Sequence, residues 1–511
     1  MRHGAADQAT FAVPLAATVH TGQSLRSPLE VASAQDYAAA GARIHAVVRS
    51  PATVTINAAQ SLTPEVVGVD PAALPLIPSW AQVVGASTGR DAQHLITDEP
   101  AAGLAGIAVP AGTRTLALAA SGDVADLDIS AWLRLPDGRD LGVPLTFDGS
   151  RLTAGLSADP TAATADPTAD LSAGAVLFAF AISENEFALT RRLHRTGEGL
   201  NDAAALTGHL DVGAPPSGDW TGWGSDGAPV RASGGHLAVD YALTGTRLVV
   251  RAGYATPVAP LPVFADAGTA AAAAGGLLSL SVGAGTPVTA RVVGVLPRFP
   301  TARPAFVIAD GRAVANALDV RTPGSGAVSE LWLEATSPGL AAALGGASFT
   351  LLRVDLRQSR EDQLAGDPVA VGATGLLTGS ALAAFVVALL ALVLLVIAER
   401  RDESAQLYAW ESDGVAPRTL RAALFLRAVA VVAVAVPGGV LIGLVLSQLT
   451  TTLVRVTAVG TEPVPPLSLA IGPLWTVEAV GAGVAAGLAG CGLIAAVALR
   501  ERLPRRPEEA F

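Results

Sequence analysis

The sequence predicts an α-helical membrane bundle of three C-terminal helices, joined to a large extracellular α+β, β-rich ectodomain that contains a β-sandwich-like insertion. Three observations lead to this fold class. Long apolar stretches follow one another near the end of the chain, at residues 375–398, 422–447 and 473–499. Arginines cluster in the segments after the first and third stretches. The residues before about 370 instead contain alternating apolar and polar positions separated by Asp-Gly turns.

Each apolar stretch is long enough to cross a lipid bilayer. A helix rises about 1.5 Å per residue, so the first stretch would extend roughly 36 Å, more than the hydrocarbon core of about 30 Å. That stretch has no charged residue, the second has only Arg427 and the third has only Glu478, each near its start. We therefore expect residues 371–511 to form a transmembrane domain in contact with lipid.

The arginines predict the orientation of these spans. Four arginines lie in the loop after the first span and four in the C-terminal tail, whereas the loop between the second and third spans has only Arg455. Because arginine-rich loops stay cytoplasmic, we expect a multi-pass protein of the cell membrane with a cytoplasmic C-terminus and an extracellular segment before about residue 370. Residues 1–30 have no signal-peptide pattern. We expect that a membrane helix precedes Met1, or that the reading frame is truncated or starts late.

Composition excludes several functions. The net charge is −11, and residues from Glu399 onward are balanced, so the predicted ectodomain carries this charge. An acidic ectodomain argues against nucleic acid as a partner. All basic residues are arginines, and without a lysine the chain cannot hold a standard phosphate-binding P-loop. If ATP drives this protein, a partner must hydrolyse it, and we expect no cofactor in this chain.

Pattern changes divide the chain before the spans into four segments. Residues 1–103 mix strand and helix patterns, with a strand expected at Phe11–Val19 and a helix at Ala34–Gly41. Residues 104–185 contain regular strands with tight turns, which indicates an antiparallel sandwich. Residues 186–235 form a loop-rich connector. Residues 236–370 have the β-α-β rhythm of a small α+β segment, with strands expected at Leu277–Val282 and Glu330–Ala335 and a helix at Arg312–Leu318.

Most candidate sites in the predicted ectodomain have a simpler interpretation. Trp220 and Trp223 could stack on a ligand such as a sugar, but packing of an irregular loop is the favoured interpretation. The aspartates around Asp126 lack the glycine and distal glutamate of a calcium loop, so a solvated turn is favoured. Gly283-Ala284-Gly285 indicates a hairpin turn. The histidines are scattered. We expect no catalytic group and no metal.

Small residues at four-residue spacing indicate close helix packing within the membrane. Glycine at this spacing lets two helices approach closely in lipid. Pro437 removes one backbone hydrogen bond and should kink the second span, either as a hinge or as fixed geometry. The residues predicted to pack or to bend the helices are Gly375, Gly379, Pro437, Gly439, Gly443, Gly483 and Gly487.

The loop between the first and second spans combines charges with an apolar, aromatic tip. Residues 402–411 are predicted to form a short helix that presents Leu407 and Trp410 among charged residues. Asp413-Gly414 would end this helix, and Pro417 would begin the next. Such a helix can lie on the lipid surface or insert into a partner protein.

At this loop the chain resembles FtsX/MacB-like ABC transporter permeases, of the actinobacterial type with a large extracellular domain. The family pattern is E-R-R-x-E-x-x-x-L followed by a glycine and a basic turn. The matching residues are Glu399, Arg400, Arg401, Glu403, Leu407, Gly414, Arg418 and Leu420. The segment 288–310 is also similar, whereas the first membrane helix of the family is missing and Arg427 stands where an acidic residue is common. These departures leave the details of ATPase coupling open.

The resemblance implies a permease subunit whose partner is a cytoplasmic ABC ATP-binding protein. Closure of the ATPases would push on the coupling loop, residues 399–421, and the bundle would transmit this movement to the ectodomain, for export or extraction of a lipid, lipoprotein, peptide or drug. A homodimer or heterodimer of permeases is a further expectation. The main alternative is a membrane-anchored extracellular protein that binds a cell-wall or carbohydrate ligand and has no ATPase partner. An enzyme ranks third.

Overall fold

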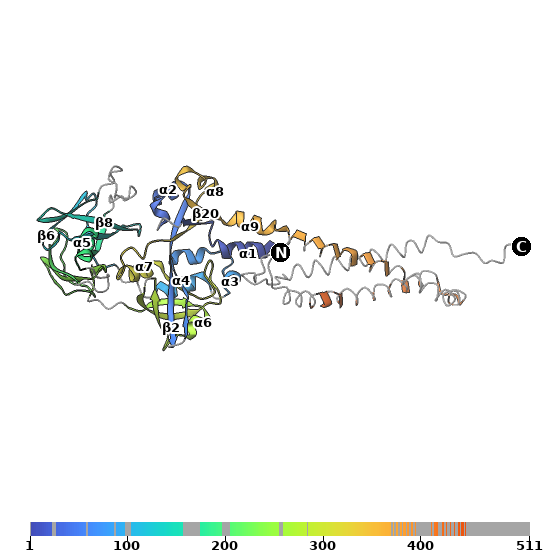
Figure 1. The fold of residues 1–511 in the computed structure, drawn as a ribbon. Helices are drawn as coiled ribbons and strands as arrows, with labels where there is room; N and C mark the ends of the chain where they lie inside the picture. The colour runs from blue at the N-terminus through green and yellow to red at the C-terminus, as the bar shows by residue number, and fades with distance from the viewer. Residues whose placement is uncertain are drawn as a thin grey trace. The chain divides into compact units, whose positions relative to one another are not determined.

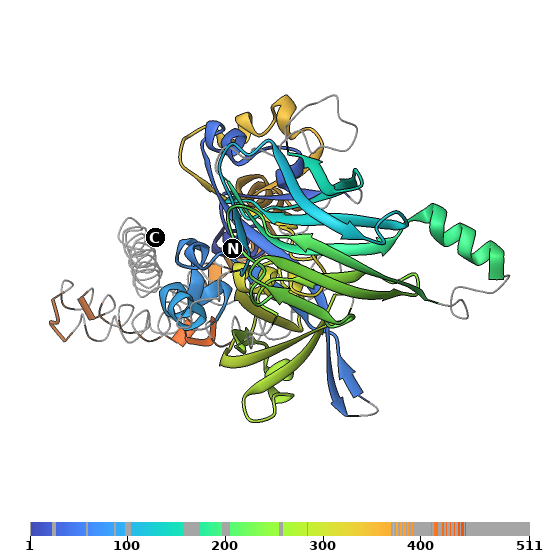
Figure 2. The ribbon, with the colours of Figure 1, turned by 90° about the vertical axis from the view of Figure 1, so that its left-hand side faces the viewer.

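The computed structural model divides the chain into two units, and the larger one comprises Ala6–Glu361. The structure describes residues 2–22, 27–57, 60–85, 88–97, 104–156, 174–196, 205–254, 259–283 and 285–368, with short stretches and single residues between 371 and 445. The larger unit contains two ten-stranded sheets (Figures 1 and 2). We call them the barrel lobe and the curled-sheet lobe. Both are β-rich, as the sequence predicts.

Six strands of the barrel lobe form a closed ring, because β16 pairs with β17 on one side and with β2 on the other. The ring consists of β2 (Ala42–Asn57), β16 (Leu277–Val282), β17 (Thr286–Val295), β15 (Leu261–Ala265), β18 (Phe306–Asp310) and β4 (Glu65–Val69). Two of its pairings are parallel, β15 with β17 and β18 with β4. Closure removes the exposed edges that an open sheet would have.

Further strands extend this sheet from β2. They are β19 (Glu330–Ala335), β1 (Ala17–Thr21), β20 (Leu352–Leu356) and the short β3 (Gln60–Leu62). The helices around the barrel lobe are α1 (Arg2–Ala12), α2 (Ala34–Ala39), α3 (Trp80–Val83), α4 (Gly89–Thr97), α6 (Ala267–Ala271), α7 (Gly311–Asp319), α8 (Leu340–Ala343) and α9 (Arg357–Ala365). Short 3-10 turns occur at η1 (Pro28–Glu30), η2 (Pro71–Leu76) and η4 (Ala347–Phe349).

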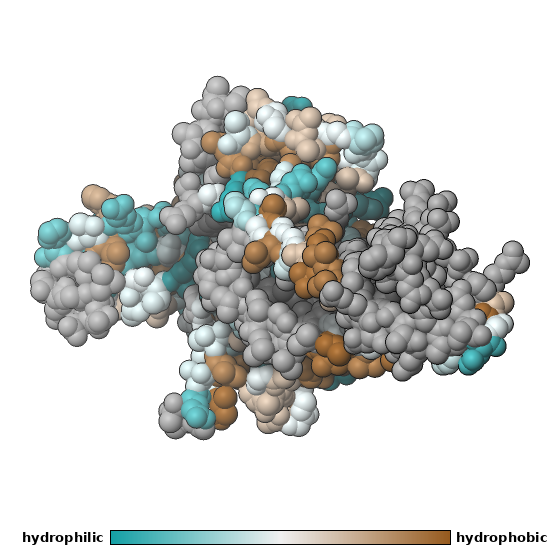
Figure 3. Space-filling model, turned by 90° about the vertical axis from the view of Figure 1, so that its right-hand side faces the viewer, coloured by the Kyte–Doolittle hydropathy of each residue, from teal (hydrophilic) through white to brown (hydrophobic). Residues whose placement is uncertain are grey.

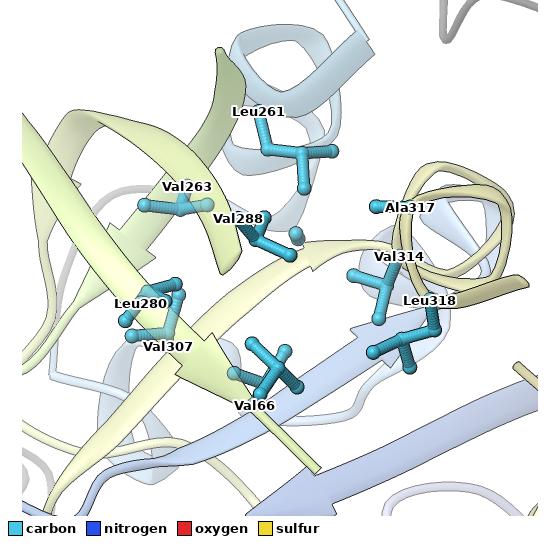
Figure 4. Close-up of a pocket in the computed structure, with 11 residues that line it drawn as sticks. Val66, Leu261, Val263, Leu280, Val288, Val307, Val314, Ala317 and Leu318 are labelled. Atoms are coloured by element: carbon cyan, nitrogen blue, oxygen red, sulfur yellow. The ribbon is translucent and has the colours of Figure 1, made fainter. Parts of the chain in front are cut away.

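Side chains on the ring strands alternate between two cores. On β18, Val307 and Ala309 face the barrel interior, whereas Phe306 and Ile308 face the cluster that includes residues of α3 and α4. This period of two follows from the pleat of a strand. Helix α7 contributes Val314 and Leu318 to the barrel core (Figure 4). Burial of each such aliphatic side chain stabilises the folded state by about 1.5–3 kcal/mol relative to leaving it exposed to water.

The curled-sheet lobe is antiparallel throughout its pairings. Its strands, in spatial order, are β12 (Val230–Ser233), β13 (His236–Leu243), β11 (Leu206–Gly213), β6 (Thr115–Gly122), β9 (Arg151–Gly155), β8 (Asp140–Phe147), β7 (Leu127–Arg134), β10 (Ala175–Glu184) and β14 (Leu248–Arg251), with β5 (Ile107–Val109) beside β10. The strands enclose one continuous apolar core. The green helix α5 (Glu186–Thr196) projects from these strands (Figure 2).

Two local predictions differ from the structure. The segment 186–235, predicted as a loop-rich connector, contains α5, β11 and β12, and its strands belong to the same sheet as those of 104–185. The strand expected at Phe11–Val19 is wrong: α1 continues to Ala12 and β1 begins at Ala17. The apolar run there begins on α1 and ends on β1, so hydrophobicity alone could not distinguish helix from strand. The hairpin turn at Gly283–Gly285 is confirmed, between β16 and β17.

Candidate functional site

Of the residues singled out in the predicted coupling loop, the structure describes Trp410 and Gly414. Trp410 is helical and about half exposed, at 53%. The N–H of Val415 donates to the Trp410 carbonyl at 3.1 Å. Gly414 has a φ of +86°, a conformation that favours glycine after a helix. The other predicted loop residues, Glu399, Arg400, Arg401, Glu403, Leu407 and Arg418, lie outside the described residues.

Four of the predicted packing glycines fall on described helical positions. At Gly375, Gly379, Gly439 and Gly443, no atom lies within 4 Å of where a Cβ would be. The close helix packing expected at these positions stays a prediction. Pro437, Gly483 and Gly487 lie outside the described residues.

The predicted spans are described only in fragments. Among the described residues, no helix combines the length and the hydropathy needed for a membrane crossing. Several described positions in the first predicted span carry exposed apolar side chains, including Leu376 and Leu382 at 76% and 62%. Figure 3 shows, in brown, the hydrophobic residues on one face of the molecule.

The chain enters and leaves the barrel lobe on neighbouring strands. β1 pairs antiparallel with β20, from Ala17 opposite Leu356 to Thr21 opposite Leu352. The N–H of Arg357 donates to the Ala16 carbonyl at 3.1 Å, directly before α9 begins. Residues more than 330 positions apart are thus joined backbone to backbone. A displacement of either end of the larger unit therefore acts on the same strand pair.

One small cavity lies in the interior of each lobe. The barrel interior leaves an unfilled volume of about 10 Å³, lined by aliphatic side chains from the strands and α7 (Figure 4). The core of the curled-sheet lobe leaves the same volume. One water molecule needs roughly 10–15 Å³. Both interiors are packed cores.

The two tryptophans weighed as a stacking site are part of the curled-sheet core, as the packing interpretation predicts. Trp220 is fully buried and Trp223 is 5% exposed. Their rings meet edge to face at 4.9 Å, and both contact Phe180. Rings that are buried in this way present no face to a carbohydrate.

The aspartates near Asp126 serve local contacts. Both oxygens of Asp126 accept from Arg191 at 2.8 Å, and the backbone carbonyl of Asp123 accepts from the Tyr241 hydroxyl at 2.5 Å. The described part of the chain contains no group of three or more His, Cys, Asp or Glu residues placed to hold a metal.

Buried His45 and partly exposed Asp70 form a pair in the barrel lobe. Nδ1 of His45 lies 2.8 Å from Oδ2 of Asp70, and Nε2 lies 3.6 Å from the carboxylate of Glu334. Burial alone would raise the pKa of Asp70, but hydrogen bonds from His45 and from the N–H of Ala72 lower it below its usual value. The pair therefore favours an ionised Asp70, and it links β2 to the start of η2.

A second buried ionic group joins the two lobes. Arg134 of β7 donates to Asp140 of β8 in its own lobe and to Asp319 of α7 in the barrel lobe. Its Nη1 donates to Oδ1 of Asn316 at 3.0 Å. Burial, followed by the neighbouring charge of Asp140, raises the pKa of Asp319 to about 8. No sequence motif pointed to this group, because its residues are far apart in the chain.

Comparison with known proteins adds no family assignment. No family model matches the chain, and no curated protein is significantly similar to it. The resemblance in the coupling loop therefore stays a prediction from the residues themselves.

Proposed function

We propose that this protein is the permease subunit of an ABC transporter. A separate cytoplasmic ATP-binding protein would bind the coupling loop around Trp410 and Gly414. The transmembrane domain would carry the resulting movement to the ectodomain, residues before about 370, on the extracellular side. The substrate class is a lipid, lipoprotein, peptide or drug, exported or extracted, and the permease would work as a homodimer or heterodimer.

The pairing of β1 with β20 is the observation that supports this proposal most. Both ends of the larger unit lie on adjacent hydrogen-bonded strands. A domain inserted between two membrane helices needs its ends close together, and a domain that responds to their movement needs them attached to a stiff element. A two-stranded edge of a ten-stranded sheet meets both needs.

The filled interiors also favour mechanical transmission over storage of a ligand. Close-packed cores have low compressibility and transmit a displacement with little loss. The described cavities, each about 10 Å³, are too small to hold a lipid or a peptide. A substrate would therefore contact the outer surface of the ectodomain.

The first test is co-purification from detergent-solubilised native membranes. We expect an ATP-binding protein to co-purify with the wild type and to be lost from Trp410→Ala and Gly414→Pro, because proline cannot adopt a φ of +86°. Leu351→Ala is the matched control, since Leu351 is an exposed apolar residue, at 73%, in the larger unit.

Two results would contradict the proposal. One is a wild-type preparation without an ATP-binding protein. The other is an ATP-binding protein whose recovery is the same with both loop variants as with Leu351→Ala. Either result would leave the anchored ligand-binding protein as the better interpretation of the spans.

A further inference from the structure

The segment Leu296–Pro304, which we call the 296–304 loop, connects β17 to β18 and contacts two helices. The guanidinium of Arg298 donates to the carbonyls of Val83 and Gln82, at 2.6 and 2.5 Å, at the end of α3. The N–H of Thr301 donates to the Phe11 carbonyl, at 2.9 Å, at the end of α1. The loop therefore holds the last turn of α1 against the barrel lobe.

Thr301 has a strained backbone. Its φ is +61°, in the left-handed region, where it is one of two non-glycine residues among those described. A β-branched side chain is disfavoured in this region because of steric conflict with the backbone. Such a conformation persists only when the surrounding structure holds it in place, and it is found most often at active sites, ligand clamps and switch regions.

Arg49 of β2 supplies the restraint on Thr301. Its Nη2 donates to the Thr301 hydroxyl, and its Nη1 lies 3.4 Å from the Thr301 carbonyl oxygen. One guanidinium thus holds both the side chain and the main chain of a strained residue.

Arg49 is itself fixed by two carboxylates. Its Nε donates to Oε2 of Glu330 at 2.5 Å, and its Nη1 lies 3.3 Å from Oε1 of Glu65. The Glu330 side chain is only 1% exposed, and its other oxygen accepts from Nε1 of Trp332 at 2.6 Å. A buried carboxylate whose two oxygens both accept hydrogen bonds is held in one orientation. The chain of contacts from Trp332 to Thr301 therefore has little freedom.

We propose that the 296–304 loop is a latch, in which strained Thr301 couples the position of the α1 C-terminal end to β2 and β19 through Arg49 and Glu330. If Thr301 relaxes to a negative φ, its N–H and its hydroxyl cannot keep both the Phe11 carbonyl and Arg49. The loop thus has two discrete arrangements, as a switching element requires. This inference rests on the proposed function, in which the ends of the larger unit respond to the membrane helices; α1 lies at its N-terminal end.

Hydrogen exchange of the purified full chain in detergent tests the latch. We expect Arg49→Gln to speed exchange at the Thr301 amide by about ten-fold or more, and to speed exchange at the Val13 amide, which donates to the Ala9 carbonyl in the last turn of α1. A purely local role for Arg49 would leave Val13 unchanged.

Arg43→Gln is the matched control for this experiment. Arg43 lies on the same strand and face as Arg49 and also pairs with a glutamate, Glu334 at 3.5 Å, but it is 69% exposed. We expect it to leave both amides within about two-fold of wild type. Thr301→Val keeps the branched side chain and replaces the hydroxyl with a methyl group. It should reproduce the effect of Arg49→Gln if that variant fails to fold.

Unchanged exchange at Val13 in a folded Arg49→Gln or Thr301→Val protein would overturn the latch. The measurement needs no ATPase, so a failed latch and a failed co-purification are separate results. If the Val13 amide responds as expected but no ATP-binding protein co-purifies, the coupling of the 296–304 loop to α1 is kept and the transporter proposal is lost.

Discussion

Gly324 lies in the barrel lobe at a position where both the backbone and a neighbouring ring exclude a side chain. Its φ is +85°, and a Cβ there would come within 2.5 Å of the Trp132 ring from the curled-sheet lobe. Trp132 is 6% exposed, and the Arg247 guanidinium lies over its ring, 5.8 Å from the ring centroid. This glycine lets the two lobes pack closely.

Gly324→Ala should destabilise the protein by about 3 kcal/mol or more, because left-handed strain and overpacking add together. Gly112→Ala is the control, since Gly112 has a similar φ of +76° but no atom within 4 Å of a Cβ. It should cost only about 1–2 kcal/mol. Thermal unfolding followed by circular dichroism measures both, and equal shifts in Tm would show that the Trp132 contact is unimportant.

At the scale of elements, most strands and helices of the larger unit follow from local pattern. The expected strands at Leu277–Val282 and Glu330–Ala335 have those bounds in the structure. The helix expected at Arg312–Leu318 is α7, which is one residue longer at each end. These segments have clear alternation or a capping residue such as Asp310. Phe11–Val19 has neither, and its prediction was wrong.

Asp266 illustrates how one side chain begins a helix and fixes a strand. Oδ2 accepts from the N–H groups of Gly268 and Thr269 at the start of α6, at 2.9 and 3.1 Å. Oδ1 accepts from the N–H of Phe306 at the start of β18, at 2.9 Å. The cap of α6 thus also ties β15 to β18.

Asp266→Ala should destabilise by about 2–3 kcal/mol, because it removes a helix cap and leaves a strand N–H without its partner. Asp310→Ala removes a similar cap from α7, with bonds to the N–H groups of Arg312 and Ala313. It should cost about 1 kcal/mol. Urea unfolding of both variants gives the comparison, which fails if Asp310→Ala is the more damaging change.

At the scale of the whole molecule, the contact between the two lobes depends on the protonation state of Asp319. Arg134 faces two carboxylates, Asp140 and Asp319, whose exposed fractions are 1% and 0%. One positive charge cannot neutralise two buried negative charges, so the cluster favours a protonated Asp319, with a pKa raised to about 8 by burial and by Asp140. The lobes are thus joined most firmly when Asp319 is neutral.

Stability should therefore fall as pH rises from about 5 to 8. The unfolded carboxyl loses its proton near 3.8, while the folded one keeps it until about 8. Between these values the folded state binds more protons, so the free energy of unfolding decreases with pH, by at most about 1.4 kcal/mol per unit. The contribution is complete below 3.8 and lost above 8.

Asp319→Asn should flatten this dependence, because the amide does not titrate. Tm measured from pH 5 to 9 gives the result. Asp148→Asn is the control: burial is absent there, and hydrogen bonds from the N–H groups of Ser150 and Arg151 lower its pKa, so it stays ionised across the range. A wild-type curve parallel to that of Asp319→Asn would contradict the assignment.

By itself, the sequence determined the periodicity of most strands and the tight turns between them, and it favoured packing of Trp220 and Trp223 over a ligand site. These properties depend on neighbouring residues, which local pattern records. The spans, the coupling loop and the permease function also come from sequence and stay predictions. Only the tertiary structure decided that the barrel closes, that β1 lies beside β20, and that Arg134 meets Asp319 and Arg49 meets Thr301. These contacts join residues more than 180 positions apart, and no local propensity encodes which distant partner a strand or a charge will find.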